Sequence, residues 1–145
     1  MREFLTLAAE APAMRFDVNR SALVRYGLGD VAVIVAFVAI GEVAHGSNPL
    51  AVLSAFAQTS LTFLVGWAIA APAIGAYRSQ TLTSWRFALG LPVLAWALAD
   101  GVGQLLRSTA YFEGSAAASF YLVALVAGGA LLAVWRAIAF RLAGE

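Results

Sequence analysis

The chain has 145 residues, of which 62% are hydrophobic and only 12% are charged, whereas a soluble domain carries roughly 25% charged residues. This composition excludes a water-soluble core and predicts membrane-spanning helices, and the length leaves room for about four of them with short loops. A formal net charge of +1 and arginines dispersed along the chain argue against nucleic-acid binding.

Two residue types are missing, and their absence excludes several kinds of chemistry. All nine basic residues are arginines, so no lysine is present to form a Schiff base. There is no cysteine, which excludes thiol catalysis, disulfide exchange and iron–sulfur ligation. A single histidine cannot supply a bis-histidine haem site, and together with scattered acids it makes a weak metal site. We therefore expect no metal and no cofactor.

Residues 1–20 carry charges of both signs and lack the apolar core of a signal peptide. They are interpreted as a cytosolic tail, and a short interfacial helix around Phe4, Leu5 and Leu7 is left open. The membrane domain is expected to cover residues 21–136. Residues 137–145 form a second cytosolic tail in this prediction.

The first two apolar stretches predict spans over about 21–44 and 50–77. Ser21 suits the N-cap of the first span, because its hydroxyl can accept a hydrogen bond from the first turn. Pro49 suits the start of the second, because proline at the first helical position gives up a hydrogen bond that it would not have made.

The last two apolar stretches predict spans over about 85–106 and 116–135, and the fourth ends at Arg136. Polar loops at 78–84 and 107–115 precede these two spans. The predicted fold is therefore all-α, an integral membrane four-helix bundle.

The arginines in the flanks of the spans predict the orientation, because cytoplasmic loops carry the excess of basic residues. Eight arginines lie on the side of the two termini and of loop 78–84, and Arg107 alone lies on the other side. Both termini are therefore expected in the cytoplasm, in a multi-pass protein of the cytoplasmic membrane.

Asp30 lies in the inner half of the first span, where an acid without a partner costs about 2.5–3.5 kcal/mol. It is expected to face the bundle interior and to meet either Arg136 or Arg86. Two interpretations stay open, a proton or ligand site and an ion pair that fixes helix packing. Glu42 is twelve positions further along, about 18 Å on the helix axis, so the two acids cannot form one site.

A second group of polar residues is expected at the outer end of the bundle. Glu42 and His45 share one face of the first span, and Asp100, Gln104 and Arg107 share one face of the third. Packing contacts or a solvated helix end are the alternative for these residues. Over both ends, the candidate intramembrane polar site comprises Asp30, Glu42, His45, Asp100, Gln104, Arg107 and Arg136.

Several short motifs follow one another along the chain. They are Asp30 early in the first span, "GEVAHG" at its end, "TFLVGW" in the second span, Arg107 after the third, "SFYLVAL" in the fourth and the closing "WR". Through them, residues 22–138 resemble DUF3054, a family of uncharacterised integral membrane proteins found in haloarchaea and some actinobacteria. Thr62 departs from that pattern, since members tend to carry a proline before the phenylalanine. The resemblance implies four helices and no established activity, so it assigns no catalytic residue.

Three functions stay open from the sequence. Acids inside spans favour a small transporter of protons or solutes, oligomeric because four helices enclose little volume. Small-residue grooves beside Trp67 and Trp96 favour a protein that binds a lipid, quinone or carotenoid. The lack of a concentrated motif favours a structural or accessory subunit of a larger membrane complex. An enzyme is not expected, because no nucleophile pattern accompanies the polar residues. The balance favours transport or small-molecule binding.

Overall fold

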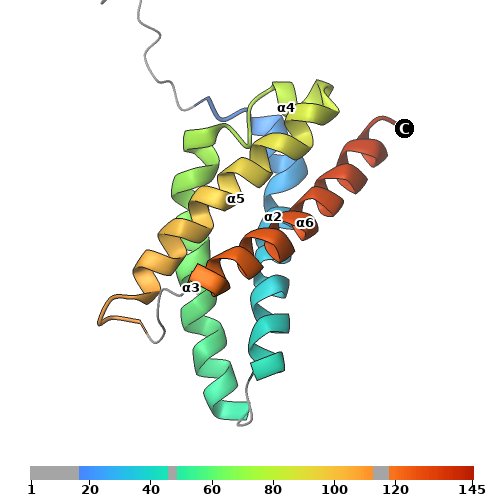
Figure 1. Cartoon of the computed structure of the whole chain (residues 1–145). Helices are drawn as coiled ribbons and strands as arrows, with labels where there is room; N and C mark the ends of the chain where they lie inside the picture. Colours follow the sequence, from blue (N-terminus) through green and yellow to red (C-terminus); the bar gives the residue numbers. More distant parts are fainter. Residues whose placement is uncertain (1–16, 46–48, 113–117) are drawn as a thin grey trace, which may run out of the picture.

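The structure is a computed structural model, and it describes residues 17–45, 49–112 and 118–145 (Figure 1). Within these ranges the chain forms α2 (Arg20–His45), α3 (Pro49–Ile74), α4 (Gln80–Thr83), α5 (Trp85–Arg107) and α6 (Ala118–Ala143). All except α4 are long and apolar enough to cross a membrane. The predicted all-α fold with four spans is confirmed, and it is the pattern of a multi-pass membrane protein.

The first long helix begins one residue earlier than predicted, and its cap is a different residue. The Asn19 side-chain oxygen accepts a hydrogen bond from the Ala22 backbone N–H at 3.1 Å. Asn19 therefore occupies the N-cap position that was assigned to Ser21, which lies within the first turn of α2. Pro49 begins α3 as predicted. The N-terminal tail up to residue 16, where a short interfacial helix was left open, lies outside the described residues.

The second span ends earlier than the predicted residue 77. Gly75 has a positive φ of 96°, a conformation that glycine adopts without the steric cost of a Cβ. The backbone N–H groups of Gly75 and Ala76 both donate to the carbonyl of Ala71, at 3.0 and 2.8 Å. This turn ends α3 at Ile74, and the chain continues from it to α4. The short helix α4 then lies in the segment predicted as a loop.

The fourth span continues past its predicted end. Arg136 was expected to close it at the membrane surface, but its side chain is fully buried. The arginine is therefore used inside the bundle, and the apolar residues that follow continue the helix to Ala143. The predicted tail 137–145 is thus helical over most of its length.

The four long helices form a closed ring, in which α2 packs against α3, α3 against α5, α5 against α6 and α6 against α2. Figure 1 shows α5 and α6 lying obliquely across the α2–α3 pair. We call the end where α2 and α5 begin and α3 and α6 end the arginine end. Its arginines with exposed or half-buried side chains are Arg20, Arg25, Arg78, Arg86 and Arg141.

An aromatic cluster fills the middle of the ring. Phe37 of α2, Phe63 of α3 and Trp96 of α5 have ring centroids 5.4–6.0 Å apart. The Trp96 indole N–H donates to the carbonyl of Ala124 in α6 at 2.9 Å, so all four helices meet here. The ring rests on Gly128, where an added Cβ would lie 2.5 Å from it.

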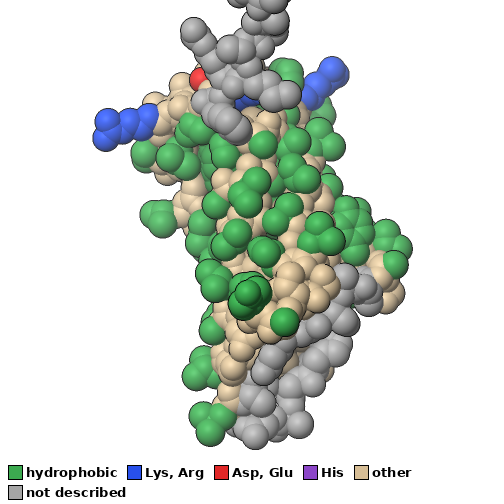
Figure 2. All heavy atoms as spheres, turned by 90° about the vertical axis from the view of Figure 1, so that its left-hand side faces the viewer, with side chains coloured by type: hydrophobic (Ala, Val, Ile, Leu, Met, Phe, Trp, Pro, Cys, Tyr) green, Lys and Arg blue, Asp and Glu red, His purple; other side chains and the backbone are tan. Residues whose placement is uncertain are grey.

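The outer surface is mainly apolar. Figure 2 shows hydrophobic side chains over most of one face, with arginines visible only near its upper end. Large side chains that point outward include Leu28, Val24 and Val126, which are 86%, 75% and 71% exposed. A surface of this kind suits contact with lipid chains rather than water.

The contact between α3 and α5 depends on Gly66. A Cβ at this position would lie 2.5 Å from the backbone oxygen of Ala99. Gly66→Ala should therefore push the helices apart and lower the free energy of unfolding by about 1–3 kcal/mol, measured by thermal unfolding in a mild detergent. Gly90→Ala is the control, because a Cβ added at Gly90 would have nothing within 4 Å. Equal melting temperatures for the two variants would contradict this packing.

The orientation stays a prediction that single cysteines can test, since the chain has no cysteine of its own. Gln80 and Tyr111 have exposed side chains at opposite ends of the bundle. If both termini are cytoplasmic, an impermeant thiol reagent added outside cells should label Tyr111→Cys and leave Gln80→Cys unlabelled until the membrane is opened. The reverse labelling would overturn the predicted orientation.

Candidate functional site

Asp30 of α2 and Arg136 of α6 form a buried ion pair. Both side chains are 0% exposed, and the closest approach is 2.7 Å, between Arg136 Nη2 and Asp30 Oδ2. Arg136 Nε also donates to Asp30 Oδ1 at 2.9 Å, so the pair is bidentate. Of the two partners that the sequence left open for Asp30, the structure therefore selects Arg136. Arg86 instead lies on the surface, with its guanidinium over the Trp85 ring.

Two further side chains complete the hydrogen bonding of the carboxylate. The Tyr77 hydroxyl donates to Asp30 Oδ2 at 2.7 Å, and the Trp135 indole N–H donates to Oδ1 at 3.1 Å. The carboxylate thus accepts four hydrogen bonds, which is about its full capacity. On the other side, Arg136 Nη1 donates to the carbonyl of Ala76 at 3.0 Å.

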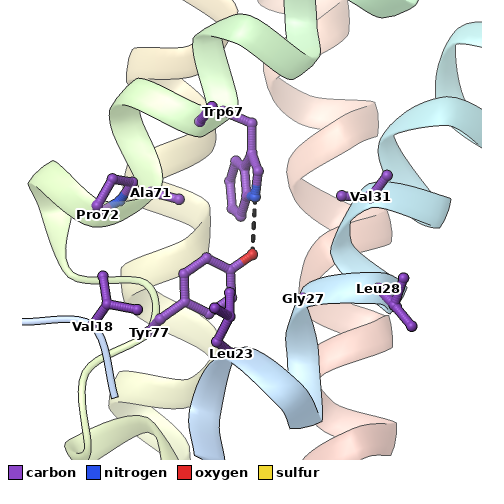
Figure 3. Close-up of a pocket in the computed structure, with 10 residues that line it drawn as sticks. Val18, Leu23, Gly27, Leu28, Val31, Trp67, Ala71, Pro72 and Tyr77 are labelled. Atoms are coloured by element: carbon purple, nitrogen blue, oxygen red, sulfur yellow. Dashed lines mark hydrogen bonds between the residues drawn. The ribbon is translucent and has the colours of Figure 1, made fainter. Parts of the chain in front are cut away.

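Trp67 and Tyr77 extend this network toward the α2–α3 interface. The Trp67 indole N–H donates to the Tyr77 hydroxyl at 3.0 Å, and Figure 3 shows the two rings meeting at that bond. Burial, and then the neighbouring Asp30 carboxylate, raises the pKa of Tyr77 above its ordinary value. The hydroxyl therefore remains protonated, as a donor to Asp30 must.

Tyr26 covers the remaining face of the guanidinium. The Arg136 guanidinium carbon lies 4.2 Å from the centre of the Tyr26 ring, a cation–π contact. The Tyr26 hydroxyl donates to the carbonyl of Thr81 at 2.8 Å, which fixes the ring against α4. Among the described residues, the Arg136 guanidinium thus contacts a carboxylate, a backbone carbonyl and an aromatic ring.

The local sequence explains why these groups meet. A Cβ at Gly29 would overlap the Trp135 ring, so the glycine beside Asp30 makes room for the indole that donates to it. The turn at Gly75 brings the Ala76 carbonyl and Tyr77 back toward the bundle. Sequence analysis missed Trp135 and Tyr77, because aromatic residues at span ends are usually interfacial anchors. The one signal in the sequence that could have indicated Trp135 is its place directly before Arg136.

Asp100, Gln104 and Arg107 form a chain of contacts along α5, on the predicted shared face. Gln104 Nε2 donates to Asp100 Oδ1 at 3.1 Å, and Arg107 Nη1 approaches Gln104 Oε1 at 3.4 Å. Asp100 is 0% exposed, yet its Oδ2 has no partner among the described residues, and the same holds for the buried Arg107 Nε. A buried polar atom without a partner costs about 1–3 kcal/mol. These atoms are therefore available to a further group.

Glu42 lies in the same region but is held by a different helix. The Thr59 hydroxyl of α3 donates to Glu42 Oε1 at 3.0 Å. Glu42 and Arg107 nevertheless line one cavity of about 480 Å³. The structure thus brings two charged members of the predicted outer group, Glu42 and Arg107, to a common space. We call this space the polar cavity; its lining residues are Phe37, Val38, Gly41, Glu42, Thr59, Phe63, Arg107, Ser119, Phe120 and Val123.

His45 is the one predicted site residue that remains to be placed. It is the last residue of α2, and its side chain lies outside the part of the chain that the structure describes. Among the described residues, no group of three or more histidine, aspartate or glutamate side chains is arranged to hold a metal ion.

Four long apolar helices around a buried ion pair, with a second polar group toward the opposite end, define a small multi-pass membrane protein. The model of a family described as protein of unknown function, DUF3054, matches residues 27–139, and the chain belongs to this family. The match covers both polar groups and confirms the resemblance seen in the sequence. No curated protein and no solved structure matches the chain.

The ion pair predicts a large effect of removing one partner. Asp30→Asn leaves the Arg136 guanidinium buried without a counter-charge, so the free energy of unfolding should fall by about 3–5 kcal/mol. Thermal unfolding in detergent measures this. Asp17→Asn, at an exposed position before α2, is the control and should leave the melting temperature unchanged. Asp30→Asn/Arg136→Gln removes both charges and should recover part of the loss. An unchanged melting temperature for Asp30→Asn would contradict the pairing.

Proposed function

We propose that the protein binds a small amphipathic molecule from the membrane in the polar cavity. The observation that carries this proposal is the composition of the lining, in which apolar residues of α2, α3 and α6 surround Glu42 and Arg107. A volume of about 480 Å³ lies in the range of ligand sites, which are mostly apolar with a few polar groups that fix orientation.

The apolar part of the lining suits the body of such a ligand. Phe37, Phe63 and Phe120 contribute three aromatic rings from three helices. Arg107 lies over the Phe120 ring, 4.6 Å from its centre, which holds the guanidinium at the cavity wall. A flat or branched hydrocarbon would fill the space between these rings.

The two charged residues specify the polar head. Arg107 supplies donors, including the buried Nε that has no partner among the described residues. Glu42 supplies a carboxylate, of which Thr59 engages one oxygen. A head with hydroxyl groups would satisfy both residues, because a hydroxyl can accept from Arg107 and donate to Glu42. A quinol, the reduced form of a quinone, is a ligand class with this chemistry.

Transport of a proton or small solute is the second candidate, and Asp100 favours it. Its carboxylate is connected to the cavity wall through Gln104 and Arg107, and one of its oxygens is buried without a partner. An acid inside a span with spare hydrogen-bonding capacity is the usual feature of a proton relay or solute site. If the protein is a transporter, the molecule that enters the polar cavity is the solute that it transports.

In either case the proposed role is binding or passage rather than catalysis. The protein would act in the cytoplasmic membrane, as a homo-oligomer or together with other membrane subunits. A purely structural role as an accessory subunit is the alternative that the following experiment separates.

The test is native mass spectrometry of the protein extracted gently from its own membranes, followed by titration with decyl-ubiquinol in detergent. Arg107→Gln and Glu42→Gln should each weaken quinol binding about tenfold or more, because a hydrogen bond to a charged group contributes about 1.5–3 kcal/mol. Arg86→Gln removes a surface charge at the arginine end and should bind as the wild type does. A protein with no bound small molecule and equal quinol affinity in all variants would overturn the proposal. A defined complex with other polypeptides would favour the accessory subunit.

A further inference from the structure

A second cavity of about 480 Å³ lies between α2 and α3 at the arginine end, and we call it the α2–α3 groove. Figure 3 shows its residues arranged between the two helices, with Trp67 and Tyr77 on one side and Leu28 and Val31 on the other. Leu28 is 86% exposed and Val31 39%, so this wall also faces the surroundings of the bundle. The full lining is Val18, Leu23, Gly27, Leu28, Val31, Trp67, Ala68, Ala71, Pro72 and Tyr77.

The side chains that line the groove have no polar atom free to bind a ligand. Their two polar atoms are the Trp67 indole nitrogen and the Tyr77 hydroxyl oxygen. The indole donates to the hydroxyl, and the hydroxyl donates to Asp30. Whatever fills the groove at this depth must therefore be hydrocarbon, because a polar group would lose its hydrogen bonds without replacement.

The groove is basic where it meets the arginine end, beside Val18 and Leu23. Arg20 begins α2 and precedes Leu23 and Gly27 by three and seven positions, so all three share one face of the helix. The Asn19 backbone N–H donates to the Tyr77 carbonyl at 2.7 Å. Arg20 and Arg78 directly follow these two bonded residues, so the structure brings two positive charges to the same end of the groove.

The length of this face matches one leaflet of a bilayer. From Arg20 to Val31 the helix advances eleven residues, which is about 16 Å. Half of a hydrocarbon layer of about 30 Å is nearly the same distance. An anionic head at Arg20 would thus place its hydrocarbon chain along the whole groove.

We propose that the α2–α3 groove binds one anionic phospholipid, with an acyl chain in the groove and the phosphate at Arg20 and Arg78. Charge complementarity favours this occupant over a second copy of the chain. Two copies in the same orientation would bring their arginine ends together, and the like charges would repel. A neutral hydrocarbon would fill the groove but leave both arginines without a counter-charge from residues 17–45, 49–112 and 118–145.

The test is native mass spectrometry of the full chain in detergent with phosphatidylglycerol or phosphatidylcholine of the same acyl chains. Phosphatidylglycerol should bind more tightly, and Arg20→Gln should weaken its binding about fivefold with little effect on phosphatidylcholine. Arg141→Gln removes an exposed arginine of the same end from α6, away from the groove, and is the matched control. Ala68→Leu fills the groove from an exposed position of α3 and should weaken the binding of both lipids.

Three results would overturn the proposal. Equal affinity for the two lipids in the wild type would remove the role of charge. Equal losses in Arg20→Gln and Arg141→Gln would indicate general surface attraction. A dimer that Ala68→Leu dissociates would show that a second copy occupies the groove. The results with Ala68→Leu count only if this variant keeps the wild-type melting temperature. Gly27→Ala fills the groove less, from the opposite wall, and should weaken the binding of both lipids in the same direction.

Discussion

The ion pair between Asp30 and Arg136 joins the first and last long helices across 106 residues of sequence. A carboxylate inside an apolar bundle is costly unless its charge and its lone pairs are satisfied. The surrounding structure meets that requirement, because the turn at Gly75 delivers Tyr77 and the Ala76 carbonyl, and the gap at Gly29 admits Trp135. The place where α3 ends and the way in which α6 crosses α2 are thus tied to one buried charge.

The two polar groups differ in how completely they are satisfied. The four hydrogen bonds to Asp30 occupy about all the lone pairs of its carboxylate, an arrangement typical of an ion pair that holds helices together. Asp100 and Arg107 each keep a buried atom without a partner among the described residues, and native proteins contain few such atoms. This contrast is the reason why the proposed binding site is placed at the outer polar group and not at the ion pair.

The number of spans and the pairing of Asp30 with an arginine could be predicted from the sequence, since both follow from the cost of placing polar groups in lipid. The choice between Arg136 and Arg86 could not, because it depends on how α6 crosses α2. Tyr77 was assigned to the second span and to the interface, because the left-handed turn at Gly75 leaves no clear signal in an alanine-rich stretch. The sequence predicted that Glu42 and Arg107 lie at the same end of the bundle, but not the cavity that both line, because its walls come from the packing of several helices.

The cluster of Phe37, Phe63 and Trp96 has a consequence for any solute that would cross the membrane through this protein. The three rings come from three helices, and the third donates a hydrogen bond to the fourth. They offer only aromatic carbon to a solute at this depth, where water and ions would find no hydrogen-bonding partner. A solute that crossed through the middle of this bundle would therefore have to displace the Trp96 ring from its place against Gly128.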